Sequence, residues 1–185
     1  GRSASFHSSY SFKLENHPVI DDLTVAAAYS RYDLLDGGLD TEGVNLKLIE
    51  IRTHEGDRCD FSIEFEREIL KDPFEIVDGI EVAVGDYRQV EFEFEWSSSA
   101  KRPFFMEMEI KYGDYYLGDA LKLESRFFYR PSRFVHYQLG GDLTDADMPV
   151  GNFEAWTGFL GFRFTPTTQL SFNSLTQYDN LSKRM

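Results

Sequence analysis

Residues 90–96 read V-E-F-E-F-E-W and alternate strictly between two kinds of side chain. The even-numbered positions are apolar, whereas the odd-numbered positions are all glutamates. Because successive side chains of a strand point to opposite faces, the stretch predicts a β-strand with one apolar face and one acidic face. A helix would scatter both kinds of side chain around its circumference. The function depends on which face meets a protein core, a lipid bilayer or water inside a pore.

The same period of two recurs along most of the chain, and no segment has a convincing helical period. We expect a single domain, residues 1–185, that is all-β and folds as an antiparallel up-and-down meander of about ten strands. The alternating segments begin near Phe6, Leu23, Val44, Phe61, Val90, Met106, Leu121, Val135, Leu160 and Leu170.

The composition excludes several classes of protein. The net charge of -13 argues against nucleic-acid binding, because a phosphate backbone needs clustered Lys and Arg. The single cysteine, Cys59, excludes an internal disulfide and a cysteine-based metal site. No apolar run approaches the ~20 residues of a membrane-spanning helix. A mean hydropathy of -0.40 hides strands that are strongly apolar on one side and strongly polar on the other.

The predicted connections alternate in length along the chain. Since alternate connections of a meander lie at the same end, one end is expected to carry tight turns and the other long loops, as in outer-membrane barrels. Predicted strands of about nine to twelve residues also match the ~9 to 11 needed to cross a bilayer. We therefore expect a transmembrane β-barrel of the bacterial outer membrane, complete in this chain or part of a larger barrel, with a soluble barrel as the alternative. Short connections are expected at 17–22, 54–57, 97–102, 129–133 and 165–167, and longer ones at 33–43, 71–86, 113–119 and 143–152.

A membrane barrel turns its apolar side chains to lipid and its polar side chains to the lumen. A solvated acidic face of a soluble sheet is the competing interpretation. We expect lipid-facing positions at Phe92, Phe94, Trp96, Met106, Met108, Ile110, Leu121, Leu123, Phe162 and Phe164. We expect a lumen lined by the acidic residues Glu64, Glu66, Glu91, Glu93, Glu95, Glu107 and Glu109 and by the basic residues Lys111, Lys122 and Arg126.

The acidic residues are expected to oppose one another across neighbouring strands. Pairing about the 97–102 turn sets Glu93 near Glu107 and Glu91 near Glu109, and like charges directly opposite are destabilising. Lys122 is expected to offset part of this repulsion as a cross-strand partner of Glu109.

The histidines, acids and glycines are the residues that would carry a catalytic or metal-binding motif. The four histidines have no metal-type spacing, and the chain has no nucleophile elbow and no Gly-rich phosphate loop. We expect no enzymatic activity, no cofactor and no dedicated metal site. The residues Asp142, Asp145 and Asp147, expected in one loop, could bind Ca²⁺ through oxygen ligands, with a solvated loop as the competing interpretation. Asp36, Asp40 and Glu42 form a second acidic stretch of the same kind.

Several short motifs resemble those of a known family. They are Phe74-Glu-Ile with Gly85-Asp-Tyr-Arg88, Tyr112-Gly-Asp-Tyr-Tyr-Leu-Gly118, Tyr129-Arg-Pro-Ser132, Asp145-Ala-Asp-Met-Pro149, Phe164-Thr-Pro166 and Leu175-Thr-Gln-Tyr-Asp-Asn180. Over about residues 58–180 the chain resembles the C-terminal barrel region of an uncharacterised bacterial outer-membrane β-barrel family. In that family the barrel usually follows a periplasmic domain resembling family 9 carbohydrate-binding modules. The domain and a final hairpin are missing from this sequence, so a larger barrel is one expectation.

The expected function is the passage or capture of a solute through an acidic lumen, and the resemblance implies a saccharide-related solute. The expected partners are outer-membrane lipid and lipopolysaccharide, together with a protein partner of unknown identity in the same membrane. Two alternatives stay open: a structural barrel that anchors or scaffolds a surface or secretion complex, and a soluble ligand-binding β-barrel.

Overall fold

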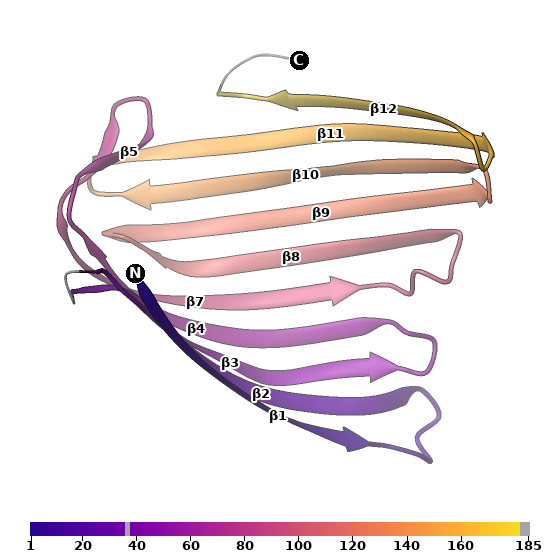
Figure 1. The fold of residues 1–185 in the computed structure, drawn as a ribbon, viewed down its shortest axis with the longest axis horizontal. Coiled ribbons are helices and arrows are strands. Elements are labelled where there is room, and N and C mark those ends of the chain that lie inside the picture. Colours follow the sequence, from indigo (N-terminus) through magenta and orange to yellow (C-terminus); the bar gives the residue numbers. More distant parts are fainter. Residues whose placement is uncertain (36–37, 182–185) are drawn as a thin grey trace.

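The computed structural model describes residues 1–35 and 38–181. It confirms an all-β antiparallel meander: ten strands form one sheet in the order β1-β2-β3-β4-β7-β8-β9-β10-β11-β12 (Figure 1). The strands of this sheet are β1 (Arg2–Lys13), β2 (Ile20–Asp33), β3 (Leu39–Thr53), β4 (Arg58–Leu70), β7 (Gly85–Ser97), β8 (Phe104–Tyr115), β9 (Gly118–Ser132), β10 (Val135–Met148), β11 (Gly151–Thr167) and β12 (Leu170–Asp179).

A small hairpin interrupts the meander between β4 and β7. Its strands are β5 (Phe74–Val77) and β6 (Ile80–Val82), which form a separate two-stranded sheet. β4 and β7 are nevertheless direct neighbours, with Leu70 opposite Gly85 at the point where the chain leaves and rejoins the sheet. In Figure 1 the segment that contains β5 and β6 runs past the ends of the strands that follow β4 and reaches the end of β11.

The large sheet is curved and open. Figure 1 shows its edge strands β1 and β12 standing forward of the middle strands, so the sheet has a hollow side and a convex side. Within residues 1–35 and 38–181, β1 pairs only with β2, and β12 pairs only with β11. All residues of β1 are exposed. The sheet therefore leaves two free edges and does not close into a barrel by itself.

Several strands are longer than the sequence pattern indicates. β9 has 15 residues and β11 has 17. β8 and β9 are joined by Tyr116 and Leu117 alone, and β10 and β11 by Pro149 and Val150 alone. The long loops expected at 113–119 and 143–152 are therefore wrong, and so is the strict alternation of short and long connections. Acidic and glycine-rich residues suggest loops, but here cross-strand pairing outweighs their low strand propensity.

The connection at 71–84 is long, as expected. The one expected at 33–43 is shorter, because β3 already begins at Leu39 and includes Asp40 and Glu42. Asp36 lies outside the described residues.

The strand register separates two faces. On one face Phe92, Phe94 and Trp96 of β7 lie opposite Tyr112, Ile110 and Met108 of β8. On the other face Glu93 and Glu95 lie opposite Lys111 and Glu109. We call these the apolar face and the charged face. All the side chains expected to face lipid share the apolar face, and all those expected to line a lumen share the charged face.

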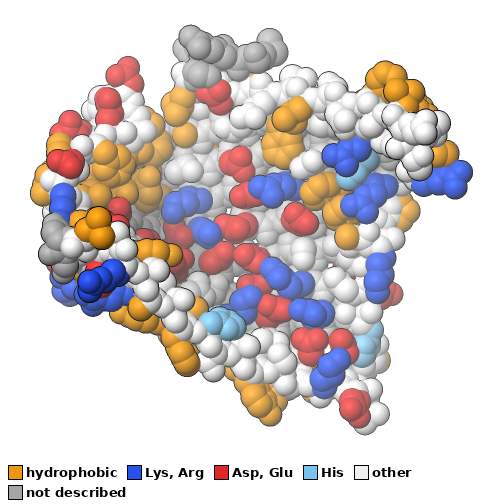
Figure 2. Space-filling model, in the orientation of Figure 1, with side chains coloured by type: hydrophobic (Ala, Val, Ile, Leu, Met, Phe, Trp, Pro, Cys, Tyr) orange, Lys and Arg blue, Asp and Glu red, His pale blue; other side chains and the backbone are white. Residues whose placement is uncertain are grey.

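Burial is inverted relative to an ordinary soluble sheet. Large side chains of the apolar face are exposed, including Phe92 at 45% and Tyr112 at 55%. Acids of the charged face are buried, including Asp60 at 3% and Glu50 at 7% exposure. Figure 2 shows the charged side chains gathered over the middle strands, within the hollow of the sheet. None of the described segments forms a helix that is long and apolar enough to cross a bilayer.

Candidate functional site

The register between β7 and β8 decides which charges meet. Glu93 lies opposite Lys111, Glu95 opposite Glu109, and Glu91 opposite Gly113. The expected pairs Glu93–Glu107 and Glu91–Glu109 are therefore wrong. The physical reason is the connection 98–103, where Ser98 N–H donates to the carbonyl of Met106 and thereby fixes the start of β8. This register opposes one acid with a lysine and leaves a single pair of glutamates face to face.

Two lysines of the charged face, Lys111 and Lys122, form ion pairs with its glutamates. Lys111 Nζ lies 2.6 Å from Glu109 Oε1 and 3.5 Å from Glu93 Oε1. Lys122 Nζ lies 2.6 Å from Glu91 Oε2, on a strand that is not its direct neighbour. The expected pair of Lys122 with Glu109 is wrong, because Glu109 lies opposite Glu124 and Lys122 lies opposite Lys111. Lys111 thus screens an acid of its own strand and its direct cross-strand partner, whereas Lys122 reaches past β8 to an acid of β7.

A second group of ion pairs surrounds the buried carboxylate of Asp60. Lys47 Nζ lies 3.3 Å from Asp60 Oδ2 and 2.8 Å from Glu50 Oε2. Arg58 Nε lies 3.4 Å from Asp60 Oδ1, and Arg58 Nη2 lies 2.5 Å from Glu95 Oε2. Burial of a charged group requires such partners, because an unpaired buried carboxylate costs several kcal/mol. This network joins β3, β4 and β7.

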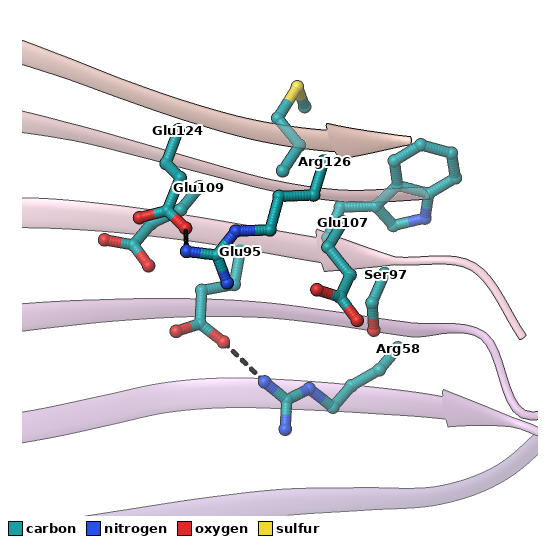
Figure 3. Close-up of a pocket in the computed structure, with 9 residues that line it drawn as sticks. Arg58, Glu95, Ser97, Glu107, Glu109, Glu124 and Arg126 are labelled. Carbon is teal, nitrogen blue, oxygen red and sulfur yellow. Dashed lines mark hydrogen bonds and ion pairs between the residues drawn. The ribbon is translucent and has the colours of Figure 1, made fainter. Parts of the chain in front are cut away.

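A cavity of about 330 Å³ opens on the charged face between β4 and β9. Figure 3 shows two guanidinium groups entering it, with Arg58 paired to Glu95 and Arg126 paired to Glu124. Glu107 also lines the cavity and forms no ion pair with any described residue. The lining carries four glutamates and two arginines, so its fixed charge is negative. The full lining is Arg58, Glu95, Trp96, Ser97, Glu107, Met108, Glu109, Glu124 and Arg126.

Three acids of the charged face, two of which line the cavity, come close enough to share one cation. Carboxylate oxygens of Glu93, Glu95 and Glu109 all lie within 4.8 Å of one another. Oxygen ligands of this kind suit hard cations such as Ca²⁺ or Mg²⁺. Lys111 and Arg58 already contact the same carboxylates, so their charge is largely compensated within the protein.

Other acids on the charged face lack such compensation. Glu64 lies directly opposite Glu91, and Glu66 follows on the same face. Among the described residues neither Glu64 nor Glu66 takes part in an ion pair, although the positive charge of Lys122 acts on Glu66 through space. Uncompensated acids in a hollow concentrate cations from the surrounding solution. The charged face is therefore suited to cationic or strongly polar solutes.

The loop predicted at 143–152, which offered a possible cation site, is wrong. Asp142, Asp145 and Asp147 all lie in β10, with Asp142 opposite Glu124 and Asp145 opposite Leu121. Because strand side chains alternate, Asp142 is on the charged face and the other two are on the apolar face. The three carboxylates do not converge.

The most important feature missed at the sequence level is a small apolar core under the β5–β6 hairpin. Six of the seven buried hydrophobic residues among the described residues lie in the hairpin or at the strand ends on the same side of the sheet: Ile80, Val82, Tyr87, Ala120, Ala146 and Met148. A usable signal was present, because the apolar pairs 74/76 and 80/82 flank Asp78-Gly79, a pair of residues typical of hairpin turns. Gly79 indeed has a φ of 83°.

Tyr116, in the turn between β8 and β9, belongs to the same region. Its ring lies 5.5 Å from that of Phe74 and 5.3 Å from that of Tyr87. Burial raises the pKa of Tyr116, and the nearby carboxylate of Glu68 raises it further. Tyr116 therefore stays neutral and packs as an aromatic residue.

Comparison of the chain with protein-family models, curated proteins and solved structures finds no match. The resemblance to an outer-membrane family consequently rests on the short motifs alone. The site is defined by its own geometry: an acidic, ion-paired hollow backed by an exposed apolar surface.

Proposed function

We propose that this chain forms the wall of an outer-membrane β-barrel whose charged face lines an aqueous path for a solute. The observation that carries the proposal is the inversion of the two faces. Large apolar side chains are exposed on the convex side, while ion pairs fill the hollow side. A membrane barrel has this arrangement, because its outside meets lipid and its inside meets water.

The exposed apolar surface supports the proposal because it is continuous across the sheet. Soluble monomers rarely expose contiguous apolar patches larger than a few hundred Å². Here every strand of the large sheet places at least one apolar side chain on this face. Exposed examples are Phe6, Tyr10, Phe12, Tyr29, Phe61, Phe65, Phe92, Tyr112, Leu121, Tyr129, Tyr137, Leu139, Leu160 and Phe172.

The proposal requires the sheet to close around the charged face. In a bilayer an unpaired strand edge costs several kcal/mol for each unsatisfied backbone group, so β1 and β12 must pair with each other or with further strands. Both edges are suited to pairing. The stretch 3–12 of β1 and the stretch 170–178 of β12 contain no Lys, Arg, Asp or Glu, the residues that protect exposed edges in soluble proteins.

The charges of the hollow indicate which solutes pass most easily. Glu64, Glu66 and Glu107 have no ion-pair partner among the described residues, so they favour cations over anions. The only support for a saccharide-related solute is the resemblance to the outer-membrane family. A scaffolding barrel would share the exposed apolar face, but it would have no need of an acidic hollow.

Reconstitution tests this function. In planar bilayers we expect a cation-selective current, and changing Glu91, Glu93 and Glu95 to Gln should reduce the selectivity. The matched control changes three acids away from the charged face: Glu15→Gln, Asp72→Asn and Glu154→Gln. Purification as a soluble monomer without detergent, or absence of any current even from variants without residues 71–84, would overturn the proposal. Equal loss of selectivity in the control would show that the charged face is not the path.

A further inference from the structure

The β5–β6 hairpin lies across one end of the charged face. We infer that it is a fixed, acidic constriction that limits the size of the solute at this mouth. The inference rests on the proposed function, and it adds the element that determines specificity. Its support comes from what the hairpin covers, how far it reaches and which charges it carries.

The hairpin lies at an end of the charged face where small side chains of the wall are buried. Ala120 and Ala146 lie opposite each other on the charged-face side of β9 and β10. They are 3% and 0% exposed, although the neighbouring Lys122 and Asp142 on the same face are accessible. Ile80 and Val82 of β6 are buried with them. Burial of Ile80 and Val82 indicates that the hairpin is packed and is not a loop that samples solvent. The rings of Tyr115 and Phe153, whose centroids lie 6.4 Å apart, help to cover the two alanines at this end of the sheet.

Contacts place the hairpin over a wide part of the sheet. The Tyr87 hydroxyl of β7 donates to the Ala83 carbonyl at 2.8 Å, which fixes the chain just after β6. At the other side, a Cβ added to Gly151 of β11 would lie 3.1 Å from Ile80 Cδ1. Since β8, β9 and β10 lie between β7 and β11, residues 80–83 cross the ends of three strands.

Small side chains make room for this crossing. Along β9 the charged face changes from Arg126, Glu124 and Lys122 to Ala120, and along β10 it changes from Asp142 and Thr144 to Ala146. The switch from long polar to small apolar residues occurs at the end of the sheet where the hairpin lies. The sequence of the wall is thus matched to the hairpin.

The exposed side of the hairpin is acidic. Glu75 and Glu81 are cross-strand partners, and Asp78 lies in the turn between them. The Glu75 carboxylate accepts a hydrogen bond of 2.6 Å from Gly79 N–H, which stabilises the turn. These three acids add negative charge at the mouth, so the constriction favours the same cations as the charged face.

A releasing variant tests whether the hairpin sets the size limit. Ile80→Ser with Val82→Ser removes its two buried anchors, whereas Val84→Ser with Val150→Ser changes residues that are 57% and 47% exposed. Neutral polyethylene glycols of increasing length, used in proteoliposome swelling, report size without charge. Limited proteolysis of residues 71–84 reports release of the hairpin independently.

We expect the releasing variant to admit polymers that the unmodified protein excludes, with a several-fold rise in conductance, and the exposed-site control to behave as the unmodified protein. A second variant replaces residues 71–84 with Asn-Gly, which joins the paired residues Leu70 and Gly85 directly and leaves the β4–β7 ladder intact. If the first variant does not fold, this second variant supplies the test, and it should likewise admit polymers that the unmodified protein excludes.

The outcomes separate this inference from the proposed function. An unchanged size limit in conducting variants overturns the constriction alone. If the unmodified protein shows no conductance but the variants do, the hairpin closes the path completely, which supports the constriction. Absence of conductance in all of them overturns both the proposed function and the constriction.

Discussion

Arg102 and Asp57 form a two-pronged ion pair that ties together two turns at the same end of the sheet. Arg102 Nη1 lies 2.6 Å from Asp57 Oδ1, and Arg102 Nη2 lies 2.9 Å from Asp57 Oδ2. The backbone N–H of Ser99 donates to the same carboxylate at 2.8 Å. The β3–β4 and β7–β8 connections are therefore held as one unit, although residues 58–97 separate them along the chain.

Loss of the Arg102–Asp57 ion pair is expected to destabilise the sheet. Asp57→Ala leaves the Ser99 N–H and the Arg102 guanidinium without their acceptor, which should lower the free energy of unfolding by roughly 1–2 kcal/mol. Glu55→Gln, which changes the more exposed partner of Arg102, should have less effect. Urea unfolding of the detergent-solubilised protein measures both variants, and equal effects would show that the shared carboxylate is not the anchor.

The same pair predicts a pH dependence. The Arg102 guanidinium holds the pKa of Asp57 below its ordinary value, and the Ser99 N–H contributes in the same direction. Because the folded pKa is depressed, the stabilisation is present above the unfolded pKa, near ~3.9, and is lost as the pH falls through the folded pKa. The stability difference between the unmodified protein and Asp57→Ala should therefore narrow below about pH 4. A constant difference from pH 7 to pH 2 would contradict this account.

The sequence predicts which side chains share a face of a strand, but it does not predict the register between neighbouring strands. Alternation in 90–96 predicts the strand and its two faces, because the period of two is local. It does not predict that Glu93 meets Lys111, because the register depends on how residues 98–103 turn. The prediction that the acids of β10 lie in a loop is wrong for a related reason. Asp142 and Asp145 resemble a loop locally, but Glu124 and Leu121 are their partners far along the chain.

The hairpin core could not be located from sequence for a different reason. The Asp78-Gly79 turn is a local signal, but the contact of Ile80 with Gly151 is a tertiary one. Only the structure brings these segments together and explains why Ala120 and Ala146 interrupt the charged face.

Lys122 is expected to be the most sensitive cation of the charged face. Its Nζ screens Glu91, which lies directly opposite Glu64. Lys122→Gln should lower the free energy of unfolding by about 1–2 kcal/mol, because it leaves Glu91 facing Glu64 without the cation that screens it. Adding Glu91→Gln should recover part of the loss, which a double-mutant cycle measures. Lys13→Gln, at a 70% exposed side chain, is the control and should change little.

Overpacking should disturb the hairpin core. Ala146 is fully buried, so Ala146→Leu has no space for the added atoms and should cost about 1–3 kcal/mol of unfolding free energy. Ala27→Leu makes the same change on the exposed apolar face and should be neutral in lipid or detergent. Proteolysis within 71–84 should increase only in the Ala146 variant. An unaffected Ala146 variant would contradict close packing of the hairpin on β10.

A charge on the apolar face distinguishes lipid from water as its surroundings. Phe92 lies near the middle of β7 and is 45% exposed, so in water Phe92→Lys would cost little. At the middle of a bilayer a lysine on the lipid face costs ~2–4 kcal/mol, and near the interface only ~0–1 kcal/mol. Phe104→Lys, at the first residue of β8, supplies the interfacial control at a similar exposure. Folding titrations in phospholipid vesicles should therefore show a large loss for Phe92→Lys and a small one for Phe104→Lys. Equal and small losses at both positions would place the apolar face in water, and the membrane proposal would then fail.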